Sequence, residues 1–273
     1  MNEFKLITTK EGWCKELKNY KTDWYHTWSY HEMAFKRSEG KPILFVLTNK
    51  IYGSIAIPLL LRNIKFQNKY KDMTSVYGYP GFVFSSESAR KLYSVFIEQL
   101  KTWSKKNFVV SIFSRQNSLL IDPKNLRMCS PNGETVVVNL NLNENEQRAR
   151  YRSVHRNLLR RLENNGFSAN WSRSKESIED FKTIYIKTMK ALDANEYYFF
   201  DNYYYNDLLK SDEFEVRIYN VCQNRLKVCS GIFIFYRDIV QYHLSGVLQE
   251  YKKFSPTLML IDKARKDATE LGF

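Results

Sequence analysis

Arginines gather near the middle of the chain in a spacing that could bind an anion. Six of them occur between Gln147 and Leu162 with no acidic residue among them: Arg148, Arg150, Arg152, Arg156, Arg160 and Arg161. On one continuous helix, four would form a stripe at i, i+4 spacing: Arg148, Arg152, Arg156 and Arg160. The core-facing stripe would hold Tyr151, Val154, Leu158 and Leu162. Guanidinium groups bind phosphate oxygens with paired hydrogen bonds, so the pattern predicts a phosphate site, with a solvated basic face as the alternative.

The run Gln241–Gly246 has the composition of a strand that carries polar side chains. Because side chains alternate along a strand, one face would carry Gln241, His243 and Ser245. The other face would carry Tyr242, Leu244 and Gly246, where a glycine suits a bulge or a close backbone approach. A helix begins soon afterwards, at Ser255-Pro256. A strand, a short loop and a helix N-terminus commonly hold the pyrophosphate of an acyl-CoA.

An aromatic, glycine-bearing loop, Tyr77-Gly78-Tyr79-Pro80-Gly81, is the third candidate. It is too rigid and aromatic for a phosphate-binding loop, but it could form the wall of a substrate cleft, because tyrosine combines an apolar ring with a polar hydroxyl. The alternative is a plain turn.

Several common kinds of site are excluded by the spacing of their residues. His31-Glu32 begins like a zinc-protease motif, but position 35 is Phe rather than His, and we expect no metal site. The chain has no G-x-S-x-G elbow, no Walker loop and no G-x-G-x-x-G.

Composition indicates a folded, basic protein. The 273 residues carry 42 Lys and Arg against 29 Asp and Glu, a formal charge of +13, and 44% are hydrophobic. A basic surface can meet nucleic acid, anionic lipid or phosphorylated small molecules. The longest apolar stretch, Ile55–Leu61, is far too short for a membrane span. With no signal-peptide pattern at the N-terminus and only four dispersed cysteines, we expect a cytoplasmic protein without disulfides.

The elements that must position these residues fall into two similar series. In the first half we predict strands at Phe4–Thr8, Ile43–Thr48, Ile51–Ile64, Met73–Val76, Phe108–Phe113 and Glu134–Leu140. The predicted helices are Lys10–Lys18, one capped by Asp23 that runs to Arg37, and one from Ser85 or Ser86 to Lys105.

In the second half the arginine helix ends at Asn164-Asn165-Gly166, and strand Phe167–Trp171 follows. We then predict a long helix at Glu176–Asp193 and a short helix that ends at Lys210. Three consecutive strands follow: Phe214–Cys222, Leu226–Tyr236 and Ile239–Gly246. The last predicted helix runs from Pro256 to about Leu271. The polar stretch Asn141–Glu146 is the predicted boundary, which gives an α+β fold of two lobes, residues 1–145 and 146–273.

Short motifs in this order resemble FemAB-like acyltransferases over nearly the whole chain. In the first lobe they are Asp23-Trp-Tyr-His-Thr-Trp-Ser-Tyr-His31, Ile57-Pro-Leu-Leu-Leu-Arg62, Asp72-Met-Thr-Ser-Val-Tyr-Gly-Tyr-Pro-Gly81 and Ile112-Phe-Ser-Arg115. In the second lobe they are Ser153-Val-His-Arg-Asn157 with Gly166, Tyr197-Tyr-Phe199, Tyr242-His-Leu-Ser-Gly246, Ser255-Pro256 and Leu271-Gly272.

The resemblance implies two tandem GNAT-like lobes with mixed, mostly antiparallel sheets flanked by helices. It implies transfer of an acyl or aminoacyl group to an amine of a peptidoglycan precursor or another sugar-linked acceptor of the cell envelope. The acceptor would be linked to a nucleotide or a lipid. The donor would be a co-substrate, aminoacyl-tRNA or an acyl-CoA, and no cofactor is expected.

Site residues follow from the same resemblance. The catalytic candidates are Tyr242, His243 and Tyr79. The substrate-binding candidates are Arg156, Arg160, Arg152, Arg62, Tyr30, Tyr77 and Arg115, with Arg156 expected against the diphosphate of the acceptor.

Two departures from related sequences matter. Acetyl-CoA users carry a glycine-rich loop before the helix, whereas Gln249–Pro256 has no glycine, which counts against acetyl-CoA in the second lobe. Relatives also continue past Leu271-Gly272, so the second lobe is expected to lack its last strands. The alternatives are an acetyl-CoA-dependent N-acetyltransferase of polysaccharide biosynthesis and a non-catalytic binder of tRNA or another nucleic acid.

Overall fold

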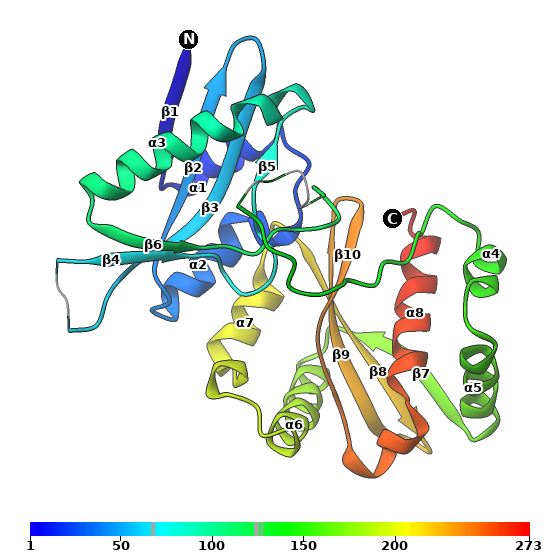
Figure 1. Cartoon of the computed structure of the whole chain (residues 1–273). Helices are drawn as coiled ribbons and strands as arrows, with labels where there is room; N and C mark the ends of the chain where they lie inside the picture. The colour runs from blue at the N-terminus through cyan, green and yellow to red at the C-terminus, as the bar shows by residue number, and fades with distance from the viewer. Residues whose placement is uncertain (67–68, 123–125, 127) are drawn as a thin grey trace. The chain divides into compact units, whose positions relative to one another are not determined.

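A computed structural model of the chain describes residues 1–66, 69–122, 126 and 128–273. The chain divides into two compact units, Met1–Thr135 and Val136–Phe273, and each is described by itself (Figure 1). Among the described residues, we find no helix with the length and apolar character that crossing a bilayer requires.

The first unit is built on a mixed sheet with strand order β1-β2-β3-β4-β6. Its strands are β1 (Asn2–Ile7), β2 (Lys41–Asn49), β3 (Gly53–Asn63), β4 (Lys71–Thr74), β6 (Val109–Phe113) and β5 (Val83–Phe84), which pairs with β3. All pairs are antiparallel except β4 with β6, which is parallel.

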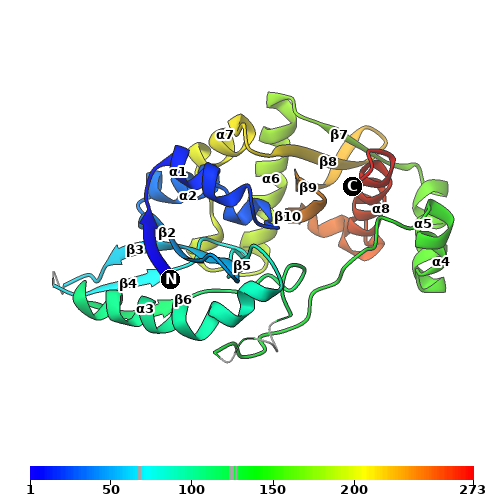
Figure 2. The same cartoon turned by 90° about the horizontal axis from the view of Figure 1, so that it is seen from above.

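Helices cover both faces of the first sheet (Figure 2). Phe96 and Leu100 of α3 (Tyr93–Lys106) pack on one face against Phe45 of β2. Trp13 and Leu17 of α1 (Lys10–Leu17) pack on the other. The described residues of this unit also form α2 (Trp28–Lys36) and the 3-10 turns η1 (Trp24–His26) and η2 (Ser88–Leu92). The central strands β2 and β3 are nearly continuous apolar runs rather than alternating ones, as burial of both faces of this sheet requires.

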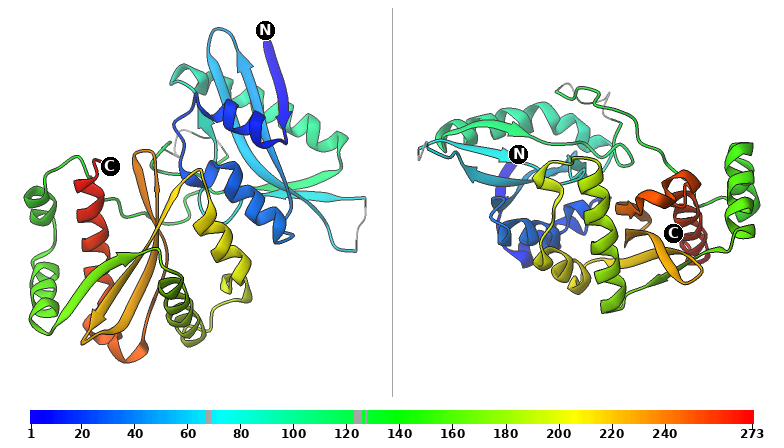
Figure 3. Two further views of the ribbon diagram at one scale, coloured as in Figure 1. Left: turned by 180° about the vertical axis from the view of Figure 1, so that it is seen from behind. Right: turned by 90° about the horizontal axis from the view of Figure 1, so that it is seen from below.

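The second unit has a fully antiparallel sheet with strand order β10-β9-β8-β7. Its strands are β7 (Phe167–Ser172), β8 (Glu215–Gln223), β9 (Leu226–Tyr236) and β10 (Ile239–Val247). Its helical elements are α4 (Glu144–Ala149), α5 (Ser153–Asn164), α6 (Lys175–Ala191), η4 (Glu196–Tyr198), α7 (Asn202–Lys210), η5 (Gln249–Phe254) and α8 (Thr257–Glu270). One face of the sheet packs against α5 and α8, and the other against α6 and α7 (Figures 1 and 3).

The predicted α+β class, with mixed and antiparallel sheets flanked by helices, is confirmed. The three consecutive strands of the second half occur almost as predicted, as β8, β9 and β10. The last helix begins directly after Pro256, and Gly166 has a positive φ of 74° where α5 ends, as a C-terminal glycine requires.

Four predicted elements are wrong in detail. Residues 134–140 form no strand. The helix expected from Asp23 is two pieces, because the Asp23 side chain caps η1 while Thr27, in extended conformation, caps α2. The predicted arginine helix is also two pieces, α4 and α5, and Arg152 between them has an extended ψ of 145°. The helix predicted from Ser85 or Ser86 starts as the 3-10 turn η2.

Candidate active site

A β-bulge in β10 determines which side chains the strand presents. The pairing with β9 shifts between Tyr242 and Leu244, so that His243 is the extra residue. Strict alternation would place Tyr242 and Ser245 on opposite faces, as the sequence predicted. Because the bulge inserts one residue, they meet instead, and the Tyr242 hydroxyl donates to Ser245 Oγ.

Tyr242 lies on the α8 side of the sheet and is partly open to solvent. Its ring centroid is 5.1 Å from that of Phe233 of β9, and the side chain is 41% exposed because α8 packs mainly on β7, β8 and β9. Burial of the phenol raises the pKa of Tyr242 to about 12. At neutral pH the hydroxyl therefore keeps its proton and serves as a hydrogen-bond donor.

His243 points to the other side of the sheet and is buried. Its Nε2 lies 2.5 Å from the Tyr204 hydroxyl of α7. Burial lowers the pKa of His243 to about 3, so the imidazole is neutral at pH 7. This geometry suits a residue that fixes α7 and the bulge, and the predicted catalytic role of His243 stays a prediction.

Gly246 lets α6 approach the end of β10 closely. A Cβ at this position would lie 2.8 Å from Tyr185 Cα and 2.9 Å from the Ile184 carbonyl oxygen. Thr188 Oγ1 of α6 accepts from the Val247 N–H at 2.9 Å. The sequence prediction of a close backbone approach at this glycine is confirmed.

In the first unit, the loop 77–81 is enclosed by tyrosines. The Tyr30 hydroxyl donates to the Tyr77 carbonyl at 3.0 Å. Gly78, with a φ of 106°, lies against the Tyr25 ring, which leaves no room for a Cβ. The Tyr79 ring packs edge-on against Tyr25 at 6.0 Å and is 45% exposed. The structure thus brings Tyr30, Tyr77 and Tyr79 together around Tyr25, which the sequence analysis missed.

A buried carboxylate supports this tyrosine group. Asp23 is inaccessible to solvent and accepts from the Trp24 N–H at 2.7 Å and from Asn117 Nδ2 at 2.9 Å. Burial, with Asp23 as a further cause, holds the pKa of Tyr25 well above its usual value. The sequence analysis gave Asp23 as a helix cap and as the first residue of a motif, and its link to Asn117 has no local signal.

The predicted arginines of the first unit lie apart from one another. Arg62 makes two 2.8 Å bonds to Asp72 on the neighbouring strand β4, one to each carboxylate oxygen. The Arg115 guanidinium lies 5.3 Å from the Phe113 ring centroid. Whether either contacts substrate stays a prediction.

The predicted arginine stripe does not form, because the helix breaks between Arg148 and Arg152. Arg156 donates to the carbonyls of Ala149 and Tyr151, and Arg160 donates to Asn157 Oδ1 at 3.2 Å. The buried residues of α5 are Leu159 and Leu162, whereas Val154, predicted in the core, is 67% exposed.

Charge nevertheless remains concentrated in this segment. Among the described residues, no ion pair joins any of the six arginines to a carboxylate. A polar network fixes the break in the helix: Tyr151 donates to Asp262 at 2.8 Å, and Arg265 of α8 donates to Asp262 and to Gln147. These long-range bonds explain why the sequence pattern alone predicted one helix.

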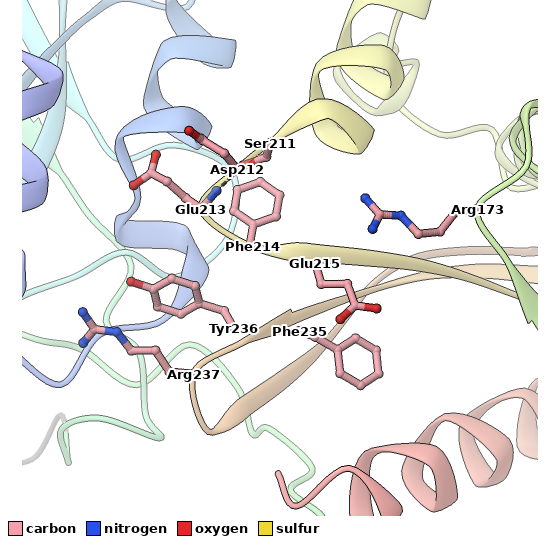
Figure 4. A pocket seen from close by; sticks show the side chains of 9 residues that line it. All are labelled: Arg173, Ser211, Asp212, Glu213, Phe214, Glu215, Phe235, Tyr236 and Arg237. Carbon is pink, nitrogen blue, oxygen red and sulfur yellow. Dashed lines mark hydrogen bonds between the residues drawn. The ribbon is translucent and has the colours of Figure 1, made fainter.

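An open depression of about 450 Å³ lies at one end of the second sheet (Figure 4). Its lining residues are Arg173, Ser211, Asp212, Glu213, Phe214, Glu215, Phe235, Tyr236 and Arg237, none of which the sequence analysis selected. Beside it, the Arg217 guanidinium stacks between the rings of Trp171 (4.4 Å) and Phe235 (4.6 Å), and its Nε donates to Glu215 at 2.6 Å.

Comparison with solved structures places this arrangement in a known fold. FemX aligns with a TM-score of 0.69 and 11% identity over 99% of this chain and 86% of FemX. The chain has the FemX fold. L-PGS from Bacillus licheniformis shares the fold at a TM-score of 0.58 and 12% identity, over 97% of this chain and 76% of its own.

A third structure with the FemX fold is the C-terminal domain (DUF2156) of a protein named as a lysylphosphatidylglycerol synthetase from Agrobacterium fabrum. It has a TM-score of 0.57 and 10% identity, and the alignment covers 95% of this chain and 76% of that one. No family model matches the sequence, and no curated protein does. The resemblance to FemAB-like proteins is therefore confirmed at the level of the fold.

Across the residues that the structure describes, no three His, Cys, Asp or Glu side chains gather as the ligands of a metal ion would.

Proposed function

We propose that this chain is an acyl- or aminoacyl-transferase that acts on an amine of a peptidoglycan precursor or another cell-envelope acceptor. Support comes from the FemX fold over 99% of the chain and from two further structures named for lysylphosphatidylglycerol synthesis. The observation that carries the proposal is the bulge in β10, which turns the hydroxyls of Tyr242 and Ser245 to one open face.

In this reaction an amine nitrogen attacks the carbonyl carbon of an activated ester. A C–N bond forms, the C–O bond of an aminoacyl ester or the C–S bond of an acyl-CoA breaks, and the ammonium proton passes to the departing oxygen or sulfur. Tyr242 remains protonated, and in the reaction its O–H turns from Ser245 to the oxygen on which negative charge develops. Ser245, the acceptor in the free chain, then donates its own hydroxyl proton to the Tyr242 oxygen and keeps it in place.

The arginine segment suits the phosphate groups of an acceptor linked to a nucleotide or a lipid. Its guanidinium groups lack acidic partners among the described residues, so they are available to a diphosphate. The proposal assigns this contact to Arg152 and Arg156, at the first turn of α5 where the helix dipole adds to the attraction, and to Arg160 one turn further along the helix.

The donor in this proposal is aminoacyl-tRNA or an acyl-CoA. An acyl-CoA would bind elsewhere than at the turn that precedes α8. The stretch before α8 is the 3-10 turn η5, and its Tyr251 and Phe254 pack on Phe167 at 6.3 and 5.6 Å. This side-chain packing disfavours a backbone cradle for the pyrophosphate of acetyl-CoA. No resident cofactor is part of the proposal.

The test is a transfer assay on the purified chain. Charged tRNA and acetyl-CoA are offered as donors, each with a UDP-linked muropeptide or its lipid-linked form, and the labelled product is identified by mass. With an active pair, Tyr242→Phe should lower kcat about 100-fold, since a lost donor at a developing oxyanion costs about that much.

Tyr203→Phe is the matched control, because Tyr203 is 78% exposed on α7. It should leave kcat unchanged. Transfer that is equally fast in Tyr242→Phe would remove Tyr242 from the chemistry. An absence of turnover with every pair, together with salt-sensitive RNA binding, would replace the proposal with the nucleic-acid binder.

A further inference from the structure

The first unit carries an exposed group of aromatic and lysine side chains, here called the aromatic tip. Its members are Lys65, Phe66, Lys69, Tyr70, Lys105, Lys106 and Phe108. They come from residues 65–66 and 69–70, between β3 and β4, and from the turn between α3 and β6 (Figures 1 and 2).

Backbone and ring contacts join the two segments into one surface. The Lys71 N–H donates to the Phe108 carbonyl at 2.9 Å, and the Ile64 N–H donates to the Tyr70 carbonyl at 3.1 Å. Lys69 Nζ lies 4.7 Å from the Phe108 ring centroid and 6.0 Å from that of Tyr70. The aromatic tip is therefore a built feature rather than two independent loops.

The phenylalanines of the aromatic tip are exposed in a backbone conformation that disfavours them. Phe66 is 99% exposed and Phe108 is 46% exposed. Their φ values are 66° and 58°, in the left-handed region where glycine or asparagine costs less. A turn alone would not retain a large apolar side chain there, so the strain points to use of the side chain itself.

The charge of the aromatic tip is positive and lacks acidic partners. Lys65, Lys69, Lys105 and Lys106 are exposed, and none takes part in an ion pair among the described residues of the first unit. The nearby carboxylate of Asp72 is bound by Arg62.

We propose that the aromatic tip docks on an anionic lipid bilayer. Phenylalanine rings insert between acyl chains, tyrosine suits the interface, and lysines sit at the level of the head groups. RNA is the competing polyanion, but phosphate recognition in RNA favours the planar guanidinium group, and no arginine belongs to the tip. The inference stands on the first unit alone and is independent of the proposed function.

The experiment is flotation of the full chain with vesicles of phosphatidylcholine alone or with a third of the lipid as phosphatidylglycerol. We expect binding to the anionic vesicles only, and its weakening by salt. The double variant Phe66→Asn, Phe108→Asn should weaken binding about tenfold. Because asparagine tolerates a positive φ, the melting temperature of this double variant should equal or exceed that of the parent chain. Weaker vesicle binding at an unchanged melting temperature would show that docking is lost while the fold is kept.

Lysine variants test the second half of the proposal. Lys65→Gln, Lys105→Gln and Lys106→Gln should each weaken binding to the anionic vesicles about fivefold. The matched control is Lys50→Gln with Ile51→Asn, in the turn at the other end of β3, where Ile51 is 81% exposed. This control should bind as the parent chain does.

Three results would overturn the proposal. The first is an absence of vesicle binding. The second is an equal loss in the control at the turn between β2 and β3. The third is binding of the tip to a structured RNA, lost in the lysine and phenylalanine variants, with no affinity for vesicles, which would make the surface an RNA contact.

Discussion

The two units place tyrosines beside a glycine in different ways. In the first unit, the Gly78 backbone lies against the Tyr25 ring, and the Tyr30 hydroxyl donates its hydrogen bond to the Tyr77 carbonyl. In the second, Gly246 lies against the α6 backbone, and the bulge before it turns Tyr242 toward solvent with its hydroxyl on Ser245. The first arrangement fixes the conformation of the loop at residues 77–81, whereas the second exposes the hydroxyl of Tyr242 to solvent.

The largest expected effect concerns the glycine of the first unit. Gly78→Ala would place a Cβ inside the Tyr25 ring and force a positive φ on alanine, so we expect a loss of about 4 kcal/mol in unfolding free energy. Urea unfolding measures it. Gly133→Ala is the control, since Gly133 also has a positive φ, of 132°, but no atom lies within 4 Å of its added Cβ. Equal losses in both variants would assign the effect to φ alone.

The corresponding change in the second unit should cost less. The added Cβ of Gly246→Ala lies 2.8 to 2.9 Å from backbone atoms of α6, so α6 or the end of the strand must shift. We expect a loss of about 2 kcal/mol in unfolding free energy, together with a fall in kcat, because the strand end moves beside Tyr242. A stability loss with unchanged kcat would separate the close approach from the chemistry.

Acid should weaken both units through one buried histidine in each. Burial lowers the pKa of His31 and of His243 to about 3, below the usual 6.5. The unfolded chain then binds more protons between these values, so each histidine lowers stability by about 1.4 kcal/mol per pH unit as pH falls below 6.5. Urea unfolding at pH 7 and pH 5 measures the sum.

Substituting one of the two histidines measures how much each contributes to the loss of stability in acid. His243→Gln should remove the contribution of the second unit and leave that of the first. Asn164→Gln, at an exposed position of α5, changes no titratable group and serves as the control. If His243→Gln retains the whole dependence, His243 does not contribute to it and another group is responsible.

The smallest expected effect concerns Arg156. Its alanine variant should weaken binding of a diphosphate-bearing ligand by about 1.5 kcal/mol, the lower end of the range for a charge-assisted hydrogen bond. It should also lower stability slightly, because the side chain bonds the carbonyls of Ala149 and Tyr151. Calorimetry measures the affinity, with Arg161→Ala as the control. If the alanine variant of Arg156 binds every such ligand as the parent chain does, the arginine segment is a solvated basic face rather than a phosphate site.

Sequence reasoning succeeded where the chain carries local signals. Strands β8 to β10 are marked by apolar runs and turns, and α8 by Pro256, so their ranges were predicted closely. The α+β class followed from the order of these elements. Such features depend on neighbours in the chain, which composition and periodicity report directly.

The sequence could not reveal features set by distant partners. The helix break near Arg152 depends on Asp262 and Arg265 of α8, and the position of the bulge at His243 coincides with its bond to Tyr204 of α7. Residues 134–140 have the composition of a strand but no ladder partner in the structure. The expected sharing of a face by His243 and Ser245 failed for the same reason, because one inserted residue reverses the alternation.

The stacking of Trp171 on Arg217 gives the second unit a spectroscopic signal of its own. Of the five tryptophans, Trp13, Trp24, Trp28 and Trp103 belong to the first unit, and Trp171 is the sole one of the second. Chain labelled with fluorotryptophan therefore resolves the two units by fluorine NMR without any substitution. Because the Trp171 ring lies 4.4 Å from a guanidinium beside the open depression, its resonance reports both the unfolding of the second sheet and the arrival of a ligand there.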